Sequence, residues 1–255
     1  MTGAAWELGK PDYTALTFPD APAERPYTIL NMVTSLDGRA VIEETERGLG
    51  STADQRLMRE LRVHADVVLN GAATLRASGT SSRLGNPALE ALRVARGKPI
   101  APIAATLSAS GDLPLERAFF TARDFDAVVY LSEGASAERR AAIEATGRRV
   151  FAVPAGDEVA SMVRHMRETL GALLLLVEGG PTINGQLFEA GLVDEVFVSV
   201  GPVIVGGAEP KTIVEQTRER SLGGTWHLEL VSAHPNAETS EVYTRYRVER
   251  RGALD

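Results

Sequence analysis

The chain has 255 residues, of which 44% are hydrophobic and 24% are charged, as is ordinary for a globular protein. Its formal net charge of −7 argues against a nucleic-acid or anionic-membrane surface. The lack of cysteine excludes disulfides and thiolate metal sites, and the four histidines show no zinc-binding spacing, so we expect no metal. There is neither an apolar run of roughly 18 residues nor a basic leader followed by an apolar stretch, so we expect a cytoplasmic protein.

Strands and helices alternate along most of the chain. In chain order the pattern predicts an irregular arm over 1–26, a strand over 27–33, a helix that begins at Ser51 or Thr52, a strand over 66–69, a loop over 78–86 and a helix over 87–96. It then predicts strands over 100–106 and 127–131, a helix over 137–145, a strand over 150–153, a helix over 159–170 and a strand over 173–176. The last part is predicted as a helix from 181 that ends at Gly191, a strand over 195–200, an extended stretch over 202–207, and antiparallel strands over 226–231 and 241–248 around a turn at 234–236. This order predicts an α/β fold with a mostly parallel central sheet, flanking helices and an antiparallel carboxyl-terminal strand pair. We expect one domain over residues 27–250.

The run from Val177 to Phe188 carries the strongest chemical pattern in the chain. Glu178 follows four consecutive leucines and precedes Gly179-Gly180, and Pro181 then opens a helix. The glycines allow a tight turn and a close approach to a ligand, and proline fits the first helical turn, where its missing N–H costs nothing. Unpaired N–H groups at such a helix start favour phosphate. We therefore expect a phosphate-bearing cofactor beside Glu178.

Two further strand ends carry polar residues in compact segments. One runs from Asn31 to Arg39 and the other from Leu61 to Arg76. Because ligands bind at the carboxyl ends of parallel strands, we expect these segments and the glycine turn to converge on one cleft. Asp37 and Glu178 are the candidate catalytic carboxylates, and Asp37 is equally suited to a structural role in a Leu-Asp-Gly turn.

Three motifs occur in register: Ser35-Leu36-Asp37-Gly38-Arg39, the segment from Leu61-Arg62 to Gly71-x-x-Thr74, and Glu178-Gly-Gly-Pro-Thr with Asp194-Glu195 after it. Over about residues 27–248 the chain thereby resembles the reductase domain of bacterial riboflavin biosynthesis, the carboxyl-terminal half of a bifunctional deaminase–reductase. The resemblance implies a dihydrofolate-reductase-like fold, a homodimer and the cofactor NADPH. It implies reduction of 5-amino-6-(5-phosphoribosylamino)uracil to its ribitylamino form, by a reductase that acts without the deaminase.

The resemblance also implies roles for individual residues. The substrate contacts fall on Glu178, Arg83, Ser51 and Arg62, with the substrate phosphate on Arg62. The cofactor contacts fall on Val33 beside the nicotinamide and on Thr74, Ser78, Gly179, Gly180, Pro181, Thr182, Ile183, Asn184, Gly185 and Gln186. The residues that select NADPH through its 2′-phosphate stay open among Arg76, Thr106 and Ser108.

The loop from Ser78 to Arg83 departs from the family pattern, which has two aspartates and a proline there. This departure leaves two other hypotheses open. One keeps the fold and cofactor but changes the substrate to a dihydrofolate-like pterin or another imine or carbonyl. The other, from a different class, is a non-catalytic nucleotide-binding protein. Away from the cleft, we expect a structural role for Asp194 and a place in the core or in a subunit interface for Trp226 and Tyr243.

Overall fold

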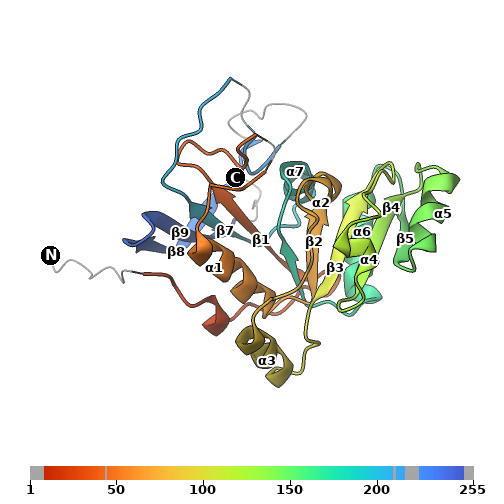
Figure 1. Ribbon diagram of the computed structural model, residues 1–255, viewed down its shortest axis with the longest axis horizontal. Coiled ribbons are helices and arrows are strands. Elements are labelled where there is room, and N and C mark those ends of the chain that lie inside the picture. The colour runs from red at the N-terminus through yellow and green to blue at the C-terminus, as the bar shows by residue number, and fades with distance from the viewer. Residues whose placement is uncertain (1–8, 44, 209–210, 216–223, 250–255) are drawn as a thin grey trace, which may run out of the picture.

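In the part of the chain that the structure describes, nine strands form one sheet (Figure 1). The computed structural model describes residues 9–43, 45–208, 211–215 and 224–249. The strands are β1 (Tyr27–Thr34), β2 (Val67–Gly71), β3 (Ile103–Ser108), β4 (Ala127–Ser132), β5 (Arg149–Val153), β6 (Leu174–Val177), β7 (Glu195–Val200), β8 (Leu228–Asn236) and β9 (Glu241–Val248).

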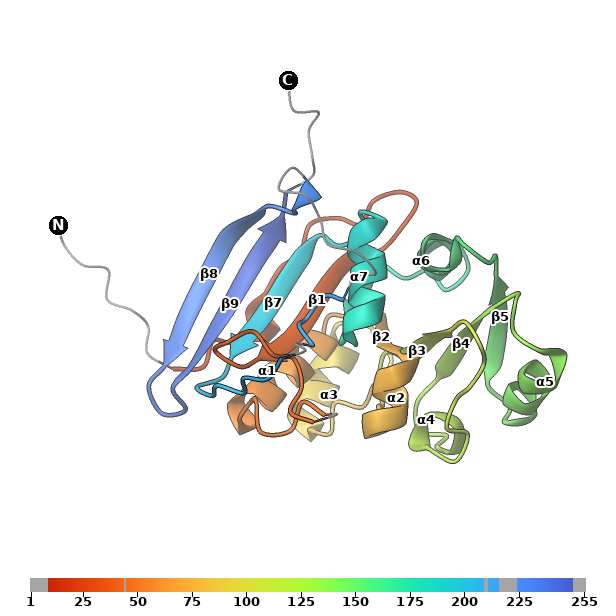
Figure 2. The ribbon, with the colours of Figure 1, turned by 90° about the horizontal axis from the view of Figure 1, so that it is seen from above.

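The strands follow the order β5-β4-β3-β2-β6-β1-β7-β9-β8, from one sheet edge to the other (Figure 2). All pairs from β5 to β7 are parallel, whereas β9 runs antiparallel to both β7 and β8. The predicted α/β class, with a mostly parallel sheet and an antiparallel carboxyl-terminal pair, is therefore confirmed.

Helices connect the parallel strands. They are α1 (Thr52–Arg62), α2 (Ala72–Ser78), α3 (Pro87–Ala95), α4 (Ala118–Thr121), α5 (Ala137–Ala145), α6 (Glu158–Glu168) and α7 (Pro181–Glu189), with a short 3-10 helix η1 (Tyr13–Ala15) before the first strand. The sequence did not predict α2 and α4, because the residues before them, Gly71 and Arg117, provide no side-chain cap.

Hydrophobic side chains fill both faces of the sheet. Val67 and Leu69 of β2 pack with α6 and α7 on one face, whereas Val68 packs with α1 on the other. A second cluster on the face of α1 joins α4 and α5 to β4. This division follows from the two-residue period of a strand, whose successive side chains point to opposite faces.

The central strand β6 is buried on both faces, which explains its unbroken apolar sequence. Leu175 and Val177 belong to the core cluster of α6 and α7, and Leu174 and Leu176 belong to that of α1. Beyond the end of β6, the Glu178 N–H donates to the carbonyl of Leu69 at 2.9 Å. The hydrogen bonding of the sheet thus fixes the position of Glu178 relative to β2.

Residues 9–26 of the amino-terminal arm pack against the body. Tyr13 lies in the core cluster of α1, and Lys10 forms an ion pair of 2.8 Å with the buried Glu60. Arg25 contacts Asp194 through two hydrogen bonds of 2.5 and 2.6 Å. The expected structural role of Asp194 is therefore confirmed.

The carboxyl-terminal region differs from the prediction at the turn between its last two strands. The turn between β8 and β9 lies at residues 237–240, and the predicted turn residues His234 to Asn236 belong to β8. Proline is tolerated there because β8 is an edge strand, where a missing backbone donor breaks no ladder. Residues 202–207 form no strand, and Gly206 and Gly207 have φ values of 69° and 93°. Tyr243 is fully buried and Trp226 packs on Phe188, so both belong to the core as expected.

Candidate active site

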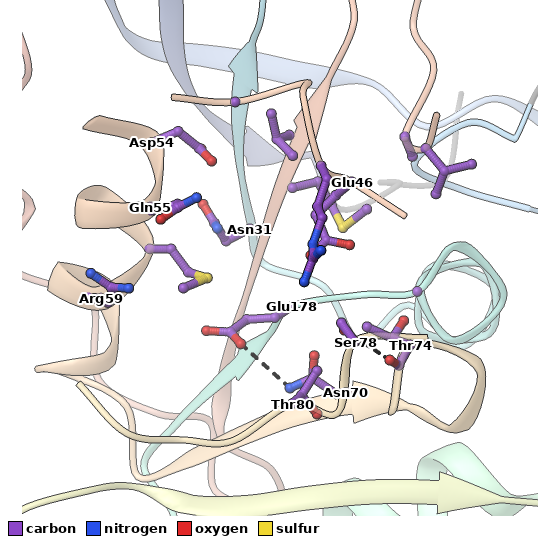
Figure 3. A pocket seen from close by; sticks show the side chains of 18 of the residues that line it. Asn31, Glu46, Asp54, Gln55, Arg59, Asn70, Thr74, Ser78, Thr80 and Glu178 are labelled. Carbon is purple, nitrogen blue, oxygen red and sulfur yellow. Dashed lines mark hydrogen bonds between the residues drawn. The ribbon is translucent and has the colours of Figure 1, made fainter. Parts of the chain in front are cut away.

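A cavity of about 680 Å³ lies where β1, β2 and β6 end (Figure 3). Its lining includes Asn31 to Val33 of β1, Asn70 of β2 and Glu178 directly after β6. The remaining walls come from α1, from the loop over 40–50 and from residues 78–81. These central strands are adjacent in the sheet, although they are far apart in sequence, and this edge of a parallel sheet is where ligands bind.

An ion pair between Arg62 and Glu178 organises one side of this cavity. Arg62 Nε and Nη2 donate to the two carboxylate oxygens of Glu178, each at 2.7 Å. The side chains are only 8% and 7% exposed, and Asn70 Nδ2 donates to the same carboxylate at 3.5 Å. Arg62 Nη1 also donates to the carbonyl of Arg83. A bidentate, charge-assisted pair of this kind fixes the direction of both groups.

Helix α1 forms a polar wall across the cavity. Figure 3 shows Asp54, Gln55 and Arg59 on this helix, with Thr74 and Ser78 on the opposite side. The pKa of Asp54 is raised to about 6, mainly because the carboxyl group is buried. A hydrogen bond from Ser199 lowers this pKa, and the nearby carboxylates of Glu241 and Glu46 raise it. A carboxyl group with this pKa holds a proton in part of the molecules near neutral pH, which suits an acid catalyst.

A second cavity, of about 420 Å³, adjoins the first. It is lined by the start of α2, the start of α7 and the residues that follow β3. Thr74, Gly180 and Pro181 line both cavities, so the two are neighbouring parts of one groove. Gly180 caps α7 without a side-chain hydrogen bond, which leaves first-turn N–H groups for an anionic ligand.

Cations and hydroxyl groups line the far part of the second cavity. Arg76, Ser108 and Lys211 are among its lining residues, with Glu158 and Glu215 as acidic neighbours. Thr106, the third residue left open for the 2′-phosphate, is fully buried and lies outside the lining. Lys211 was not expected from the sequence, because it lies far from every motif.

Glycine is required where the two cavities meet. A β-carbon at Gly180 would lie 2.8 Å from Thr74 Oγ1, and one at Gly71 would lie 3.2 Å from the Gly180 nitrogen. Both distances are shorter than an ordinary contact, so a side chain here would displace its neighbours and narrow the junction. Glycines that allow such a close approach, together with an uncapped helix start, fit a phosphate-bearing cofactor.

Most of the residues implied by the resemblance lie in this groove. The first cavity includes Arg62 and Glu178 together with Val33, Thr74, Ser78, Gly180 and Pro181. The second includes Thr182, Ile183 and Gln186 as well. Gly179, Asn184 and Gly185 lie outside the lining of both cavities. The Gly179 carbonyl accepts from the Gly71 N–H at 2.7 Å, and Asn184 Nδ2 donates to the carbonyl of Ile213 at 2.7 Å.

Asp37, Ser51 and Arg83 also lie outside the lining of both cavities. Asp37 accepts from Ser35 Oγ and from two N–H groups of residues 205 and 206, which lowers its pKa to about 2. Ser51 caps α1 and donates to Glu241 at 2.6 Å. Arg83 forms an ion pair of 2.5 Å with Asp124. All three side chains thus have structural partners.

The structure also brings into the groove polar residues to which the sequence assigned no individual role. Asn31 and Asn70 lie in strands, whereas Asp54, Gln55 and Arg59 lie on α1. The sequence does contain a pattern for Gln55 and Arg59, since positions 55, 59 and 62 share one helix face. An asparagine within an apolar strand, as at position 31, is a comparable sign of a polar site.

In the described ranges, no group of three or more His, Cys, Asp or Glu side chains is arranged to hold a metal ion. None of the helices in these ranges is long and apolar enough to cross a membrane.

Comparison with known proteins shows both family and fold. A family model for the RibD C-terminal domain matches residues 26–238. A 2,5-diamino-6-ribosylamino-4(3H)-pyrimidinone 5′-phosphate reductase from Aquifex aeolicus is 29% identical over 216 residues, which cover 82% of this chain and 91% of the relative. A reductase of the same name from Methanothermobacter thermautotrophicus is 28% identical, with coverage of 84% and 95%. A pyrimidine reductase-like protein from Corynebacterium diphtheriae shares the fold with a TM-score of 0.80, at 20% identity and with coverage of 89% and 93%.

Proposed function

The chain belongs to the RibD C-terminal domain family, and from this premise we propose that it is an NADPH-dependent reductase of a phosphoribosylamino-pyrimidine. The observation that supports this function most directly is the two-part groove. One part offers helix starts and glycines to a phosphate-bearing cofactor, and the other holds the Glu178 carboxylate, which Arg62 keeps in place. The two other hypotheses, a different substrate and a non-catalytic nucleotide-binding protein, each predict a different result in the assay described below.

We place the cofactor in the second cavity. Thr182 and Ile183 at the start of α7 would contact its pyrophosphate, and Arg76 with Lys211 would contact the 2′-phosphate. Val33 and Thr74 would then hold the nicotinamide where the cavities meet. The bound cofactor supplies the hydride, and the protein supplies orientation and exclusion of water.

The substrate belongs in the first cavity. Glu178 would accept hydrogen bonds from hydroxyl groups of the sugar-derived chain, because Arg62 and Asn70 hold its carboxylate in one orientation. The resemblance implies the uracil form of the substrate, whereas the two relatives are named for the 2,5-diamino form. Both forms carry the phosphoribosylamino group at which the reduction takes place.

The reaction adds one hydride and one proton. In the open-chain form of the substrate, the hydride adds to the imine carbon that was the sugar C1′, and the nitrogen takes the proton, so that the ribitylamino product and NADP⁺ result. Asp54 is our candidate for the acid, because its raised pKa keeps a proton available inside the cavity.

A turnover assay tests the function directly. The purified protein is incubated with NADPH and either phosphoribosylamino-pyrimidine, and NADPH oxidation is followed together with mass detection of the ribitylamino product. We expect turnover of at least one of the two and none of dihydrofolate. Turnover of dihydrofolate alone would support the different-substrate hypothesis. Tight NADPH binding without turnover of any of the three would support a non-catalytic protein.

We further propose a cytoplasmic homodimer. The edge strand β8 exposes Leu228, Leu230 and Val231, at 42%, 54% and 39% of their surface. An exposed apolar edge strand invites pairing with a second copy. Sedimentation at micromolar concentration tests this, and a monomer would refute it.

A further inference from the structure

Glu158 lines the second cavity but not the first, and the structure holds its carboxylate in place. It is the first residue of α6. Its Oε1 accepts a hydrogen bond from the hydroxyl of the buried Ser132 at 3.0 Å, and its Oε2 accepts one from the Gly156 N–H at 2.9 Å. A carboxylate has about four acceptor sites, so these two hydrogen bonds leave room for a donor that enters from the cavity.

The strand order places Glu158 on the adenosine side of the proposed cofactor. Thr74 and Gly180, which line both cavities, follow β2 and β6, whereas Ser132 is the last residue of β4. β4 lies three strand positions from β6, which is about 14 Å at about 4.8 Å per strand. With the nicotinamide where the cavities meet and the pyrophosphate at the start of α7, the adenosine extends past the end of β3 toward Glu158.

The proposed 2′-phosphate contact Arg76 lies across the sheet from Glu158. Leu75 of α2 belongs to the core cluster of α4 and α5, whereas Val159 of α6 belongs to that of α6 and α7, and Figure 2 shows α2 and α6 on opposite faces of the sheet. A 2′-phosphate at Arg76 therefore does not meet the Glu158 carboxylate. The part of the adenosine next to Glu158 must be a hydrogen-bond donor, and adenine carries one in its 6-amino group.

We propose that Glu158 accepts a hydrogen bond from the 6-amino group of adenine and so selects a cofactor with this base, with Ser132 as the positioning residue that orients the carboxylate. This inference rests on the cofactor placement proposed above. An ionised carboxylate only accepts hydrogen bonds, so a base with an oxo group at this position would bring two acceptors together. A carboxylate in the first turn also stabilises a helix, but that role alone predicts no effect on the choice of base.

The test compares NADPH with reduced nicotinamide hypoxanthine dinucleotide phosphate, which carries an oxo group in place of the 6-amino group. Calorimetry gives the Kd of both cofactors, and their ratio reports recognition of the base. We expect the hypoxanthine cofactor to bind the wild type roughly 10-fold or more weakly than NADPH, because a charge-assisted hydrogen bond is lost. In Glu158→Gln this ratio should fall to roughly 1–3, since the amide can also donate to an oxo group.

Two more variants separate recognition of the base from loss of charge or of folding. Glu215→Gln removes the same charge from the same cavity, where Glu215 accepts from Thr182 Oγ1 at 3.1 Å, and should leave the ratio as in the wild type. Ser132→Ala keeps the Glu158 carboxylate but frees it to move, so the ratio should fall roughly 3-fold. Thermal unfolding checks that each variant is folded.

The outcomes distinguish this inference from the proposed function. Tight NADPH binding by the wild type with a Kd ratio near 1, or a ratio that Glu158→Gln leaves unchanged, would overturn the role of Glu158 and leave the reductase function standing. A ratio that falls equally in Glu158→Gln and Glu215→Gln would also overturn it, because charge alone would then explain the effect. Failure of the wild type to bind either cofactor would refute the cofactor placement and this inference together.

Discussion

Gly180→Ala should weaken NADPH binding without unfolding the protein. Gly180 has φ −81° and ψ −177°, a combination of φ and ψ that alanine also adopts. The new β-carbon would lie 2.8 Å from Thr74 Oγ1, whereas ordinary contacts begin at 3.4 Å, so the two atoms must separate by about 0.6 Å (3.4 minus 2.8). The short Thr74 side chain can rotate away, but its hydroxyl then leaves the groove.

The expected loss combines two contributions. One hydrogen bond from Thr74 is worth about 1 kcal/mol, and the crowded pyrophosphate contact at the helix start loses about as much again. The sum of about 2 kcal/mol corresponds to a roughly 30-fold higher Kd for NADPH. Calorimetry measures this Kd, and thermal unfolding shows whether the fold survives.

Two variants control this experiment. Gly134→Ala places its β-carbon 3.9 Å from Ser132 Oγ, an ordinary contact, and should bind NADPH as the wild type does. In a Thr74→Ala background the clashing oxygen is gone, so Gly180→Ala should cost less there than in the wild type. Unchanged NADPH affinity in Gly180→Ala, or fully additive losses in the double variant, would refute the placement of the cofactor.

Four further predictions follow from the groove and from one buried histidine. Glu178→Gln should lower kcat/KM roughly 10- to 100-fold, because charge-assisted hydrogen bonds to the substrate hydroxyl groups are lost, while calorimetry should show NADPH affinity nearly unchanged. Asp54→Asn should abolish the fall in kcat/KM that the wild type shows as the pH rises above about 6, since that fall reports loss of the acid form, and a pH–rate profile measures this. The single variants Arg76→Gln and Lys211→Gln should each reduce the preference for NADPH over NADH, measured as the ratio of the two Kd values, roughly 10-fold. If neither variant changes this ratio, the placement of the 2′-phosphate is refuted. Burial lowers the pKa of His64 to about 4, so the unfolded chain binds more protons between pH 6.5 and 4, and the free energy of unfolding should fall by roughly 1.4 kcal/mol per pH unit as the pH drops through that window. Urea unfolding of His64→Gln should show a flatter dependence in this window, and equal slopes would contradict the assignment.

Patterns within a few residues predicted most elements correctly. The helix over 137–145 and the strand over 195–200 were predicted with their observed bounds. The four leucines before Glu178 predicted a fully buried strand, although Leu173 is 53% exposed and the strand begins at Leu174. Such predictions succeed because periodicity and capping depend on neighbours in sequence. The third strand begins at Ile103 rather than at residue 100, where the apolar run gave no sign of its start.

The sequence alone determined the parallel sheet, the helix start at Pro181 and the place of Glu178 at the end of β6. Only the tertiary structure decided what each charged residue contacts. Arg62 and Glu178 are 116 residues apart and pair because β6 lies between β2 and β1, whereas Arg83 pairs with Asp124 instead of facing the groove. The local sequence determines which helix or strand carries a cationic side chain. Its partner is fixed by strand order and side-chain packing, and in a cavity that partner decides whether the cation orients a carboxylate or remains free for a ligand.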